Sequence, residues 1–224
     1  MSRALAVLRP EPGASATIAR IETAGHRALR LPLFHVERRP WPEIDPADHD
    51  ALVLTSANAL RCAGAKLSTL LALPVWAVGK ATARAATAAG CRVVAIGDAG
   101  AEALLDRAAQ AGVGRALWLG GEALRLDHHR AVRRIVRVYA SVPAPLQPQA
   151  VQALAGSVAL VHSPRAAATL RAALDAHRIP PAALRLAAIS PAAAAAAGDG
   201  WDRIAVAPSP SDTALVATAI GLAD

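Results

Sequence analysis

Aromatic residues are scarce in this 224-residue chain: one Phe, one Tyr and four Trp make up 3% of it. Proteins that hold single-stranded nucleic acid stack bases on aromatic rings, and no such platform is present here. The longest basic runs are the pairs Arg38-Arg39 and Arg133-Arg134. We therefore expect no nucleic-acid partner. The alternative, binding of nucleic acid through the arginines, would show an affinity that falls steeply with salt. The cores must be built from Ala, Leu, Val and Ile, so the single Phe34 and the single Tyr139 stand out.

Cysteine is also scarce. Cys62 and Cys91 are the only two, they lie beside apolar residues, and they have no CxxC spacing. This usage is typical of buried free thiols in a reducing compartment. The adjacent His128 and His129 would face apart on a helix or a strand, and no set of carboxylates accompanies them. We expect no metal site.

No apolar run is long enough to cross a membrane. The longest uncharged stretch, 138–164, is interrupted by Pro143, Pro145 and Pro148, so it is not a transmembrane helix. Glu11 comes too early for a signal peptide, and no long apolar segment follows the N-terminus. We therefore expect a cytoplasmic protein without a membrane partner.

Arginine, by contrast, is abundant. The net charge is +7, and only two of the 24 basic residues are lysine. A GC-rich genome explains part of this bias. The functional interpretation is an acidic partner, because the guanidinium group matches carboxylates and phosphates in shape and charge.

A strand–turn–helix pattern occurs twice along the chain, first over 52–94 and again over 160–206. Ser56 and Ser163, each at the end of the first strand of a copy, are 107 residues apart, and the turns after the second strands are 111 apart. A spacing of this size predicts a duplicated domain rather than a short solenoid repeat. The chain length also suits two domains of roughly 100 residues.

Apolar runs alternate with alanine-rich helical segments throughout. This alternation predicts an α/β fold with parallel sheets that carry helices on both faces. The expected helices include 101–110, 164–176, 191–197, 211–220 and one that runs from Ser56 or Ala57 through Leu70. Residues 1–35 supply the first strand and helix that the C-terminal half lacks. We therefore predict a discontinuous domain of 1–34 and 143–224, and an inserted domain of 38–138.

Four short motifs carry a resemblance to a known family. They are Leu54-Thr55-Ser56-Ala57-Asn58-Ala59, Ala77-Val78-Gly79-Lys80-Ala81-Thr82-Ala83, Val138-Tyr139-Ala140-Ser141-Val142-Pro143 and Leu160-Val161-His162-Ser163-Pro164. In this order and spacing, over nearly the whole chain, the sequence resembles the uroporphyrinogen-III synthase family. The resemblance implies two flavodoxin-like α/β domains with parallel sheets, joined by a two-stranded linker formed by residues of about 30–38 and 135–142.

The resemblance also implies a reaction. The substrate would be hydroxymethylbilane, a linear tetrapyrrole with eight carboxylates. The enzyme would eliminate its hydroxyl group to give an azafulvene, invert the terminal ring through a spiro intermediate and close the macrocycle to uroporphyrinogen III. Members need neither a metal nor an organic cofactor, and the family suggests a monomer. We expect the substrate to bind between the two domains and to draw them together.

The candidate binding residues follow the strands. Ligands of open α/β sheets bind at the carboxyl ends of the strands, where helix N-termini suit carboxylates. The residues expected to bind substrate at these ends are Arg9, Thr55, Ser56, Asn58, Gly79, Lys80, Gly120, Ser163, Arg165 and Ser190. The alternative for Thr55 and Ser56 is a purely structural role as N-caps.

Tyr139 and Thr82 are the candidate catalytic residues. A phenol with an ordinary pKa of ~10 can donate a proton to a leaving hydroxyl group. The alternatives are a linker tyrosine that only packs and a threonine that only caps a helix. The second copy departs from the family pattern, because Ala193 replaces the usual threonine and His162 precedes Ser163. Its turn is then left with shape and backbone donors, and His162 either lines a pocket or belongs to the core.

A non-catalytic binding module is the alternative function. Duplicated α/β domains with a two-stranded hinge also occur in sensors and solute-binding proteins, and the alanines of the second copy leave room for a degenerate relative. The presence of Tyr139 and Thr82 favours the enzyme.

Overall fold

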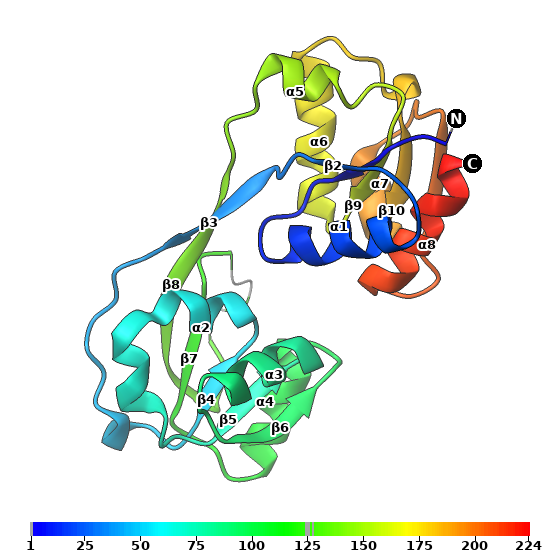
Figure 1. The fold of residues 1–224 in the computed structure, drawn as a ribbon. Helices are drawn as coiled ribbons and strands as arrows, with labels where there is room; N and C mark the ends of the chain where they lie inside the picture. The colour runs from blue at the N-terminus through cyan, green and yellow to red at the C-terminus, as the bar shows by residue number, and fades with distance from the viewer. Residues whose placement is uncertain (1, 124–125, 127) are drawn as a thin grey trace. The chain divides into compact units, whose positions relative to one another are not determined.

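The computed structural model describes residues 2–123, 126 and 128–224. It divides the chain into two compact units: unit 1 consists of Met1–His35 and Val142–Asp224, and unit 2 of Val36–Ser141. In Figure 1, unit 1 therefore combines the blue N-terminal segment with the yellow-to-red C-terminal part. Independent folding of the expected insert, 38–138, stays a prediction.

Unit 1 is built on a parallel sheet of five strands. They are β1 (Leu5–Val7), β2 (Ala28–Arg30), β9 (Val158–Val161), β10 (Arg185–Ala188) and β11 (Arg203–Val206), in the order β11-β10-β9-β1-β2. The central neighbours β1 and β9 come from opposite ends of the sequence, with Ala6 opposite Ala159. The N-terminal segment thus supplies the strand and helix that the C-terminal half lacks.

Helices cover both faces of this sheet. They are α1 (Gly13–Thr23), α5 (Pro148–Gln152), α6 (Pro164–Ala176), α7 (Pro191–Ala197) and α8 (Asp212–Ala223), with a short 3₁₀ helix, η3 (Pro181–Ala183). On one face, buried Ile21 of α1 and Leu215 of α8 share a core with Leu5. On the other face, Leu170 of α6 packs with Ala193 of α7. Every residue of β1, β9 and most of β10 is buried, as expected of parallel strands with two covered faces.

Unit 2 is built on a sheet of six strands. They are β3 (Phe34–Arg38), β4 (Leu52–Leu54), β5 (Val75–Val78), β6 (Val93–Gly97), β7 (Ala116–Gly121) and β8 (Val132–Pro143), in the order β3-β8-β7-β4-β5-β6. The helical segments are η1 (Pro46–Asp48), α2 (Ala57–Ala63), η2 (Gly64–Leu70), α3 (Lys80–Ala88) and α4 (Ala101–Gln110). Leu60 of α2 and Ala86 of α3 share one core, and Leu105 of α4 packs into the core of the opposite face.

The two sheets have the same strand order once the duplication is taken into account. Counted from the strands that precede Ser56 and Ser163, both read 3-2-1-4-5, as β6-β5-β4-β7-β8 and as β11-β10-β9-β1-β2. When the five strands of unit 1 are numbered in chain order, the sheet reads 2-1-3-4-5, which is the flavodoxin order. The numbers differ from those above because β1 and β2 come before β9 in the sequence. The predicted α/β class with two parallel sheets is confirmed.

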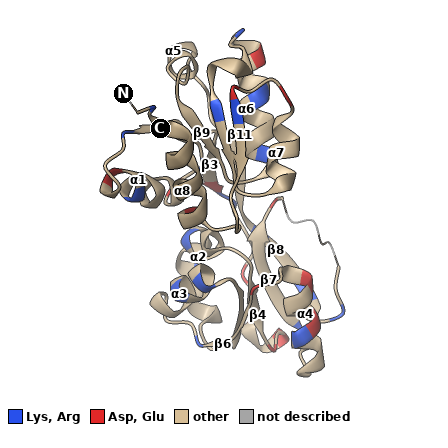
Figure 2. Ribbon diagram, turned by 90° about the vertical axis from the view of Figure 1, so that its right-hand side faces the viewer, with Lys and Arg blue, Asp and Glu red and all other residues tan. Residues whose placement is uncertain are grey.

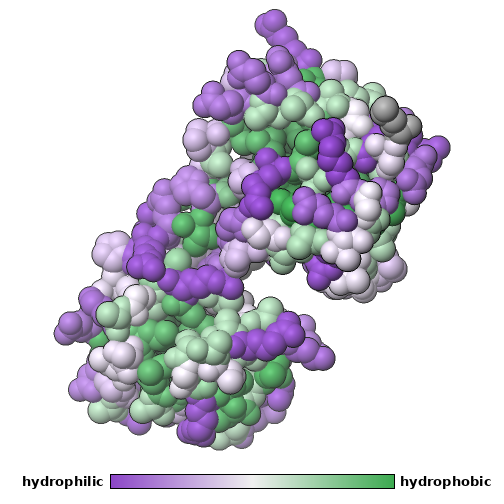
Figure 3. Space-filling model, viewed as in Figure 1, coloured by the Kyte–Doolittle hydropathy of each residue, from purple (hydrophilic) through white to green (hydrophobic). Residues whose placement is uncertain are grey.

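β3 and β8 pair with each other at the edge of the second sheet. The Arg39 N–H donates to Val138 O, and the Ala144 N–H donates to Leu33 O, each at 2.9 Å, so the pair is antiparallel. The expected linker strand 30–38 begins only at Phe34, because Arg30 belongs to β2 and pairs with Val7. Hydrophilic side chains run along β3 and β8 in Figure 3, in keeping with the exposure of Arg38 and Arg137.

The helix expected from Ser56 or Ala57 through Leu70 is broken. α2 ends at Ala63, and Gly64 has φ 69° and ψ −158°, outside the α-helical region. A glycine adopts this conformation at little cost, and it ends the helix before η2 begins. The periodic leucines that suggested one continuous helix therefore lie on two segments.

Candidate functional site

The carboxyl ends of β4, β5, β6 and β7 form one edge of the unit 2 sheet, here called the unit 2 edge. Leu54 lies opposite both Ala77 and Leu119, so the turns that follow these three strands start at one level. The sequence-predicted residues that this edge brings together, with β8 alongside, are Thr55, Ser56, Asn58, Gly79, Lys80, Thr82, Gly120 and Tyr139.

The two hydroxyl residues after β4 have different roles. Ser56 Oγ accepts a hydrogen bond from the Asn58 N–H at 3.2 Å and caps α2. Thr55 Oγ1 accepts from Trp118 Nε1 at 3.4 Å. Ser56 therefore has the structural role of an N-cap, whereas Thr55 ties the end of β4 to β7, the neighbouring strand in the sheet.

Gly79 and Thr82 shape the turn after β5. Gly79 has φ 79°, in the left-handed region that favours glycine, and its N–H donates to Gly97 O at 2.7 Å. Gly79 is itself the N-cap residue of α3, so Thr82 is not a cap. The Thr82 side chain is mostly buried in the first turn of α3, directly after the turn that follows β5.

Tyr139 lies on β8 with its ring against Gly121. The two residues are register partners, and the Glu122 N–H donates to Tyr139 O at 3.0 Å. A Cβ built on Gly121 would lie 2.6 Å from Tyr139 Cζ and 3.0 Å from its hydroxyl oxygen. The ring also packs against the core beneath α2 and α3. The absence of a side chain at Gly121 therefore fixes where the phenol lies.

Unit 1 presents the corresponding edge at the carboxyl ends of β1, β9, β10 and β11, here called the unit 1 edge. Ser163 Oγ accepts from the Ala166 N–H at 3.1 Å, and Ser190 Oγ accepts from the Ala193 N–H at 3.3 Å. Both serines cap their helices, as Ser56 does in unit 2. Ala193, where the family usually has a threonine, is fully buried.

Arg165 follows Ser163 and Pro164 in the first turn of α6. Its guanidinium carbon lies 4.3 Å from the centroid of the Phe34 ring, within the range of a cation–π contact. The only phenylalanine of the chain thus restricts the direction of a predicted substrate-binding arginine.

Arg9 is held by an acidic residue that the sequence did not single out. Its Nη1 lies 3.2 Å from Asp212 Oδ1, which also accepts from Thr17 Oγ1 at 2.7 Å. His162 Nε2 reaches the same oxygen at 2.8 Å, and Arg20 binds the other oxygen of Asp212. We call these five side chains the Asp212 cluster.

The protonation states within the Asp212 cluster follow from its contacts. Burial acts to raise the pKa of Asp212, but the hydrogen bonds from His162 and Thr17 and the nearby positive charges lower it to about 2. Burial lowers the pKa of His162, and its hydrogen bond to Asp212 opposes that effect only in part. At neutral pH Asp212 is therefore ionised and His162 neutral, with the proton of the imidazole on Nε2.

One feature of the sequence marks the position of Asp212. Ser211 and Asp212 follow β11 as a helix cap and a first-turn acid, and Ser211 Oγ accepts from the Ala214 N–H at 3.2 Å. That pattern predicts a helix start and nothing about the partners of the carboxylate. His162, expected to line a pocket or to join the core, is mostly buried and bonded to Asp212.

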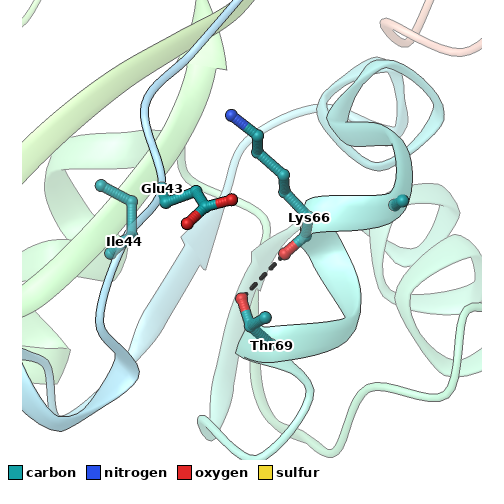
Figure 4. Close-up of a pocket in the computed structure, with 5 residues that line it drawn as sticks. Glu43, Ile44, Lys66 and Thr69 are labelled. Atoms are coloured by element: carbon teal, nitrogen blue, oxygen red, sulfur yellow. Dashed lines mark hydrogen bonds between the residues drawn. The ribbon is translucent and has the colours of Figure 1, made fainter.

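A pocket of about 310 Å³ lies elsewhere in unit 2, lined by Glu43, Ile44, Ala65, Lys66 and Thr69. Figure 4 shows the side chains of Glu43 and Lys66 directed toward the same space. Thr69 Oγ1 donates to Lys66 O at 2.9 Å, and Lys66 Nζ donates to Trp41 O at 2.7 Å. The bond from Lys66 fastens η2 to the segment before β4, and the bond from Thr69 lies within η2, so we assign this pocket no part in the site.

Metal ligands, thiols and membrane spans are three further features to consider among the described residues. No group of three or more His, Cys, Asp or Glu side chains there is arranged to hold a metal ion. Cys62 and Cys91 are buried free thiols, and burial raises the pKa of each. None of the helices in the described ranges is long and apolar enough to span a membrane.

Two sheets of mainly parallel strands, in two compact units, with helices that begin after the carboxyl ends of the strands, define a two-domain α/β protein. The family model described as uroporphyrinogen-III synthase HemD (HEM4) matches residues 15–217. The chain belongs to the uroporphyrinogen-III synthase family.

Solved structures agree with this fold. A uroporphyrinogen-III synthetase from Helicobacter pylori is 18% identical, with a TM-score of 0.66 over 99% of this chain and 100% of that one. A mutant uroporphyrinogen III synthase from Thermus thermophilus is 19% identical, with a TM-score of 0.57 over 99% of this chain and 97% of that one. A search of curated proteins found no match. At these identities the two structures support the fold alone.

Proposed function

We propose that this chain converts hydroxymethylbilane into uroporphyrinogen III, with inversion of the terminal ring and loss of water, as an enzyme of tetrapyrrole biosynthesis. The observation that carries the proposal is the family match over residues 15–217. The reaction needs no oxidant or reductant. One proton must reach the leaving hydroxyl group, and one proton must leave when a carbon–hydrogen bond gives way to the closing carbon–carbon bond.

Substrate carboxylates are proposed to bind at both edges. Helix N-termini offer backbone N–H donors and a favourable dipole. At the unit 2 edge we assign binding to residues at the starts of α2 and α3 and to the end of β7, namely Thr55, Ser56, Asn58, Gly79, Lys80 and Gly120. At the unit 1 edge we assign it to Arg9, Ser163, Arg165 and Ser190.

Tyr139 is the proposed proton donor to the leaving hydroxyl group. A phenol can serve as a general acid if it is within hydrogen-bond reach of the group it protonates. Support comes from the ring position, which contact with Gly121 and with the core holds in one place. A fixed donor suits catalysis, because little ordering is left for the moment of reaction.

Thr82 is proposed to position the substrate beside Tyr139. Its side chain is buried at the start of α3, where Gly79 already serves as the N-cap. A hydroxyl residue that caps no helix and follows the carboxyl end of a parallel strand lies where ligands of such sheets bind. This supports a role in binding.

The alternative is a binding module that has lost catalysis. It is favoured by one observation: buried Ala193 leaves the second copy without the hydroxyl that the family usually has there. The module would bind a tetrapyrrole or another small anion at the same two edges and would not change it.

Product analysis distinguishes the two functions. The protein would be incubated with freshly generated hydroxymethylbilane, and the porphyrins would be separated after oxidation. Closure without ring inversion gives the type I isomer, whereas the enzyme gives type III. An excess of type III over a protein-free control supports the enzyme. Tight binding of the substrate with only type I product would support the module.

We further propose that the chain acts as a cytoplasmic monomer. The two buried free thiols support a reducing compartment. Sedimentation equilibrium at several concentrations tests the monomer, and a mass that doubles with concentration would contradict it.

A further inference from the structure

The Asp212 carboxylate accepts four contacts and is 20% exposed. Its Oδ1 receives Arg9, Thr17 and His162, and its Oδ2 receives Arg20. The partners come from α1 and from the ends of β1 and β9, so the cluster ties three elements of the unit 1 edge to the start of α8 (Figure 1).

The cluster keeps a positive charge. Arg9, Arg20 and Asp212 together carry one net positive charge, since His162 is neutral at pH 7 and Thr17 is uncharged. The Arg9 and Arg20 side chains are 33% and 41% exposed, and α1 carries a basic stretch, blue in Figure 2. Each has five N–H donors, more than its contact to Asp212 uses. The exposed donors suit an anion from solution.

Arg9 is confined on a second side. A Cβ built on Gly13 would lie 2.3 Å from Arg9 Nε and 2.5 Å from its Cζ. The guanidinium group thus lies against the backbone at the start of α1 as well as against Asp212. A long flexible side chain held in this way loses little further entropy when it binds a ligand.

Asp202 provides a comparison within the same unit. It also pairs with two arginines, Arg3 at 3.3 Å and Arg185 at 2.8 Å. These residues precede β1, β10 and β11 or begin them, so they lie at the amino ends of the strands. Ligands of parallel sheets bind at the opposite ends. The two ion-pair groups therefore occupy opposite edges of the unit 1 sheet, and the Asp202 group lies away from the expected ligand.

We propose that Asp212 is a positioning residue: it holds the guanidinium groups of Arg9 and Arg20 in one arrangement at the unit 1 edge, where they bind a carboxylate of the substrate. The inference rests on the proposed function, because hydroxymethylbilane supplies the carboxylate. It adds Asp212, Arg20 and, through their contacts, Thr17 and His162 to the residues on which substrate binding depends.

Steady-state kinetics with hydroxymethylbilane tests this role. Asp212→Asn removes the charge and keeps the shape, so both arginines lose their anchor. We expect KM to rise about tenfold while kcat stays within about twofold, because the cluster acts in binding and does not touch the reacting atoms. Asp212→Glu should restore KM to within about threefold. Asp202→Asn, the matched control, should leave both constants at wild-type values.

Two further variants, each at an arginine on the surface, keep the proposal testable if the Asp212 variant does not fold. Arg20→Gln removes one exposed partner of Asp212, and Arg3→Gln removes one partner of Asp202. The Arg20 variant should raise KM and the Arg3 variant should not. Near-ultraviolet circular dichroism would confirm that each protein is folded. If Asp212→Asn unfolds, the comparison of the two arginine variants decides.

Several results would overturn the proposal. An unchanged KM in folded Asp212→Asn would show that the arginines need no anchor, and a lowered KM would show that the carboxylate competes with substrate. An equal rise in Asp202→Asn would assign the effect to overall charge. Each of these leaves type III product from the wild type intact and so spares the proposed function. A wild-type protein that makes no type III product would overturn both.

Discussion

The ring of Tyr139 fills the space that a side chain on Gly121 would need, with Cζ 2.6 Å from the position of a Cβ there. Gly121 is not in the left-handed region of backbone conformation, so alanine suits its backbone and only the ring stands in the way. The glycine is thus a steric requirement for the tyrosine on the neighbouring strand.

Gly121→Ala should therefore displace the phenol. We expect turnover to fall about tenfold, with an overpacking cost of about 1–3 kcal/mol in the free energy of unfolding. Gly114→Ala is the control, because a Cβ there would meet nothing within 4 Å. Single-turnover rates and urea unfolding of both variants measure the effect. Wild-type turnover in Gly121→Ala would show that the ring position does not matter.

Tyr139→Phe removes the hydroxyl group and keeps the ring. Turnover should fall about tenfold or more, as for the loss of a general acid. KM should change little, since the substrate carboxylates bind elsewhere. Rates of type III product formation at saturating substrate provide the measurement.

Thr82→Ala should lower turnover by a smaller factor, about twofold to tenfold, because it removes one hydrogen-bonding group among several. Alanine is also a good helix former, so α3 should stay intact. Thr82→Ser should keep most of the activity. If Tyr139→Phe and Thr82→Ala both retain wild-type rates, the site lies elsewhere.

The Asp212 cluster predicts how stability changes with pH. The pKa of Asp212 falls from 3.8 to about 2 on folding, so its contribution is complete above about pH 4 and is lost as the pH falls toward 2. The shift corresponds to about 2 kcal/mol. Urea unfolding at pH 7, 4 and 2 should show this loss in the wild type and a weaker one in Asp212→Asn. An identical pH dependence in the two proteins would contradict the assignment.

His162 should add a second window at higher pH. Its pKa is lowered from 6.5 on folding, so protonation favours the unfolded chain. Stability should begin to fall below about pH 6.5 and keep falling until the folded protein also takes up the proton. The groups that face the imidazole are Asp212 and Arg9. In His162→Gln the decline that begins below about pH 6.5 should shrink; a full decline there would assign it to other groups.

The discontinuous organisation predicts the behaviour of fragments. Residues 36–141 hold the complete β4–β8 sheet and both of its cores, so this segment expressed alone should be folded and should unfold cooperatively. Residues 1–142 should leave β1 and β2 without β9 and with exposed apolar faces. Circular dichroism and urea titration compare the two. A disordered 36–141 fragment beside a well-folded 1–142 fragment would contradict the division.

Most of the fold could be predicted from the sequence because residues near the ends of each helix and strand mark where it begins and ends. The residues of α6 and α7 were predicted to their exact bounds, since proline starts each helix and a serine caps it. Gly64 was the exception. The leucines on either side of it fit one helical period, and a single glycine within such a pattern is often tolerated, so its positive-φ backbone could not be foreseen.

The site was less accessible to prediction. Thr17 and Asp212 are separated by 195 positions and meet only because the first helix and the last helix pack on one face of the same sheet. Gly121 was passed over because its meaning depends on the register with β8, where a shift beside Gly120 sets Tyr139 opposite it. Residue type and local spacing indicate which groups reach the strand ends; tertiary contacts decide how they are held.

Ring inversion itself can be followed by carbon labelling. Hydroxymethylbilane would carry ¹³C in the bridge between the third and terminal rings and in the terminal-ring carbon bonded to it. Inversion breaks that bond and attaches the bridge to the other side of the ring. The account predicts that the one-bond ¹³C–¹³C coupling disappears from the product formed with this protein. A product that keeps the coupling would show closure without inversion and would contradict the central claim.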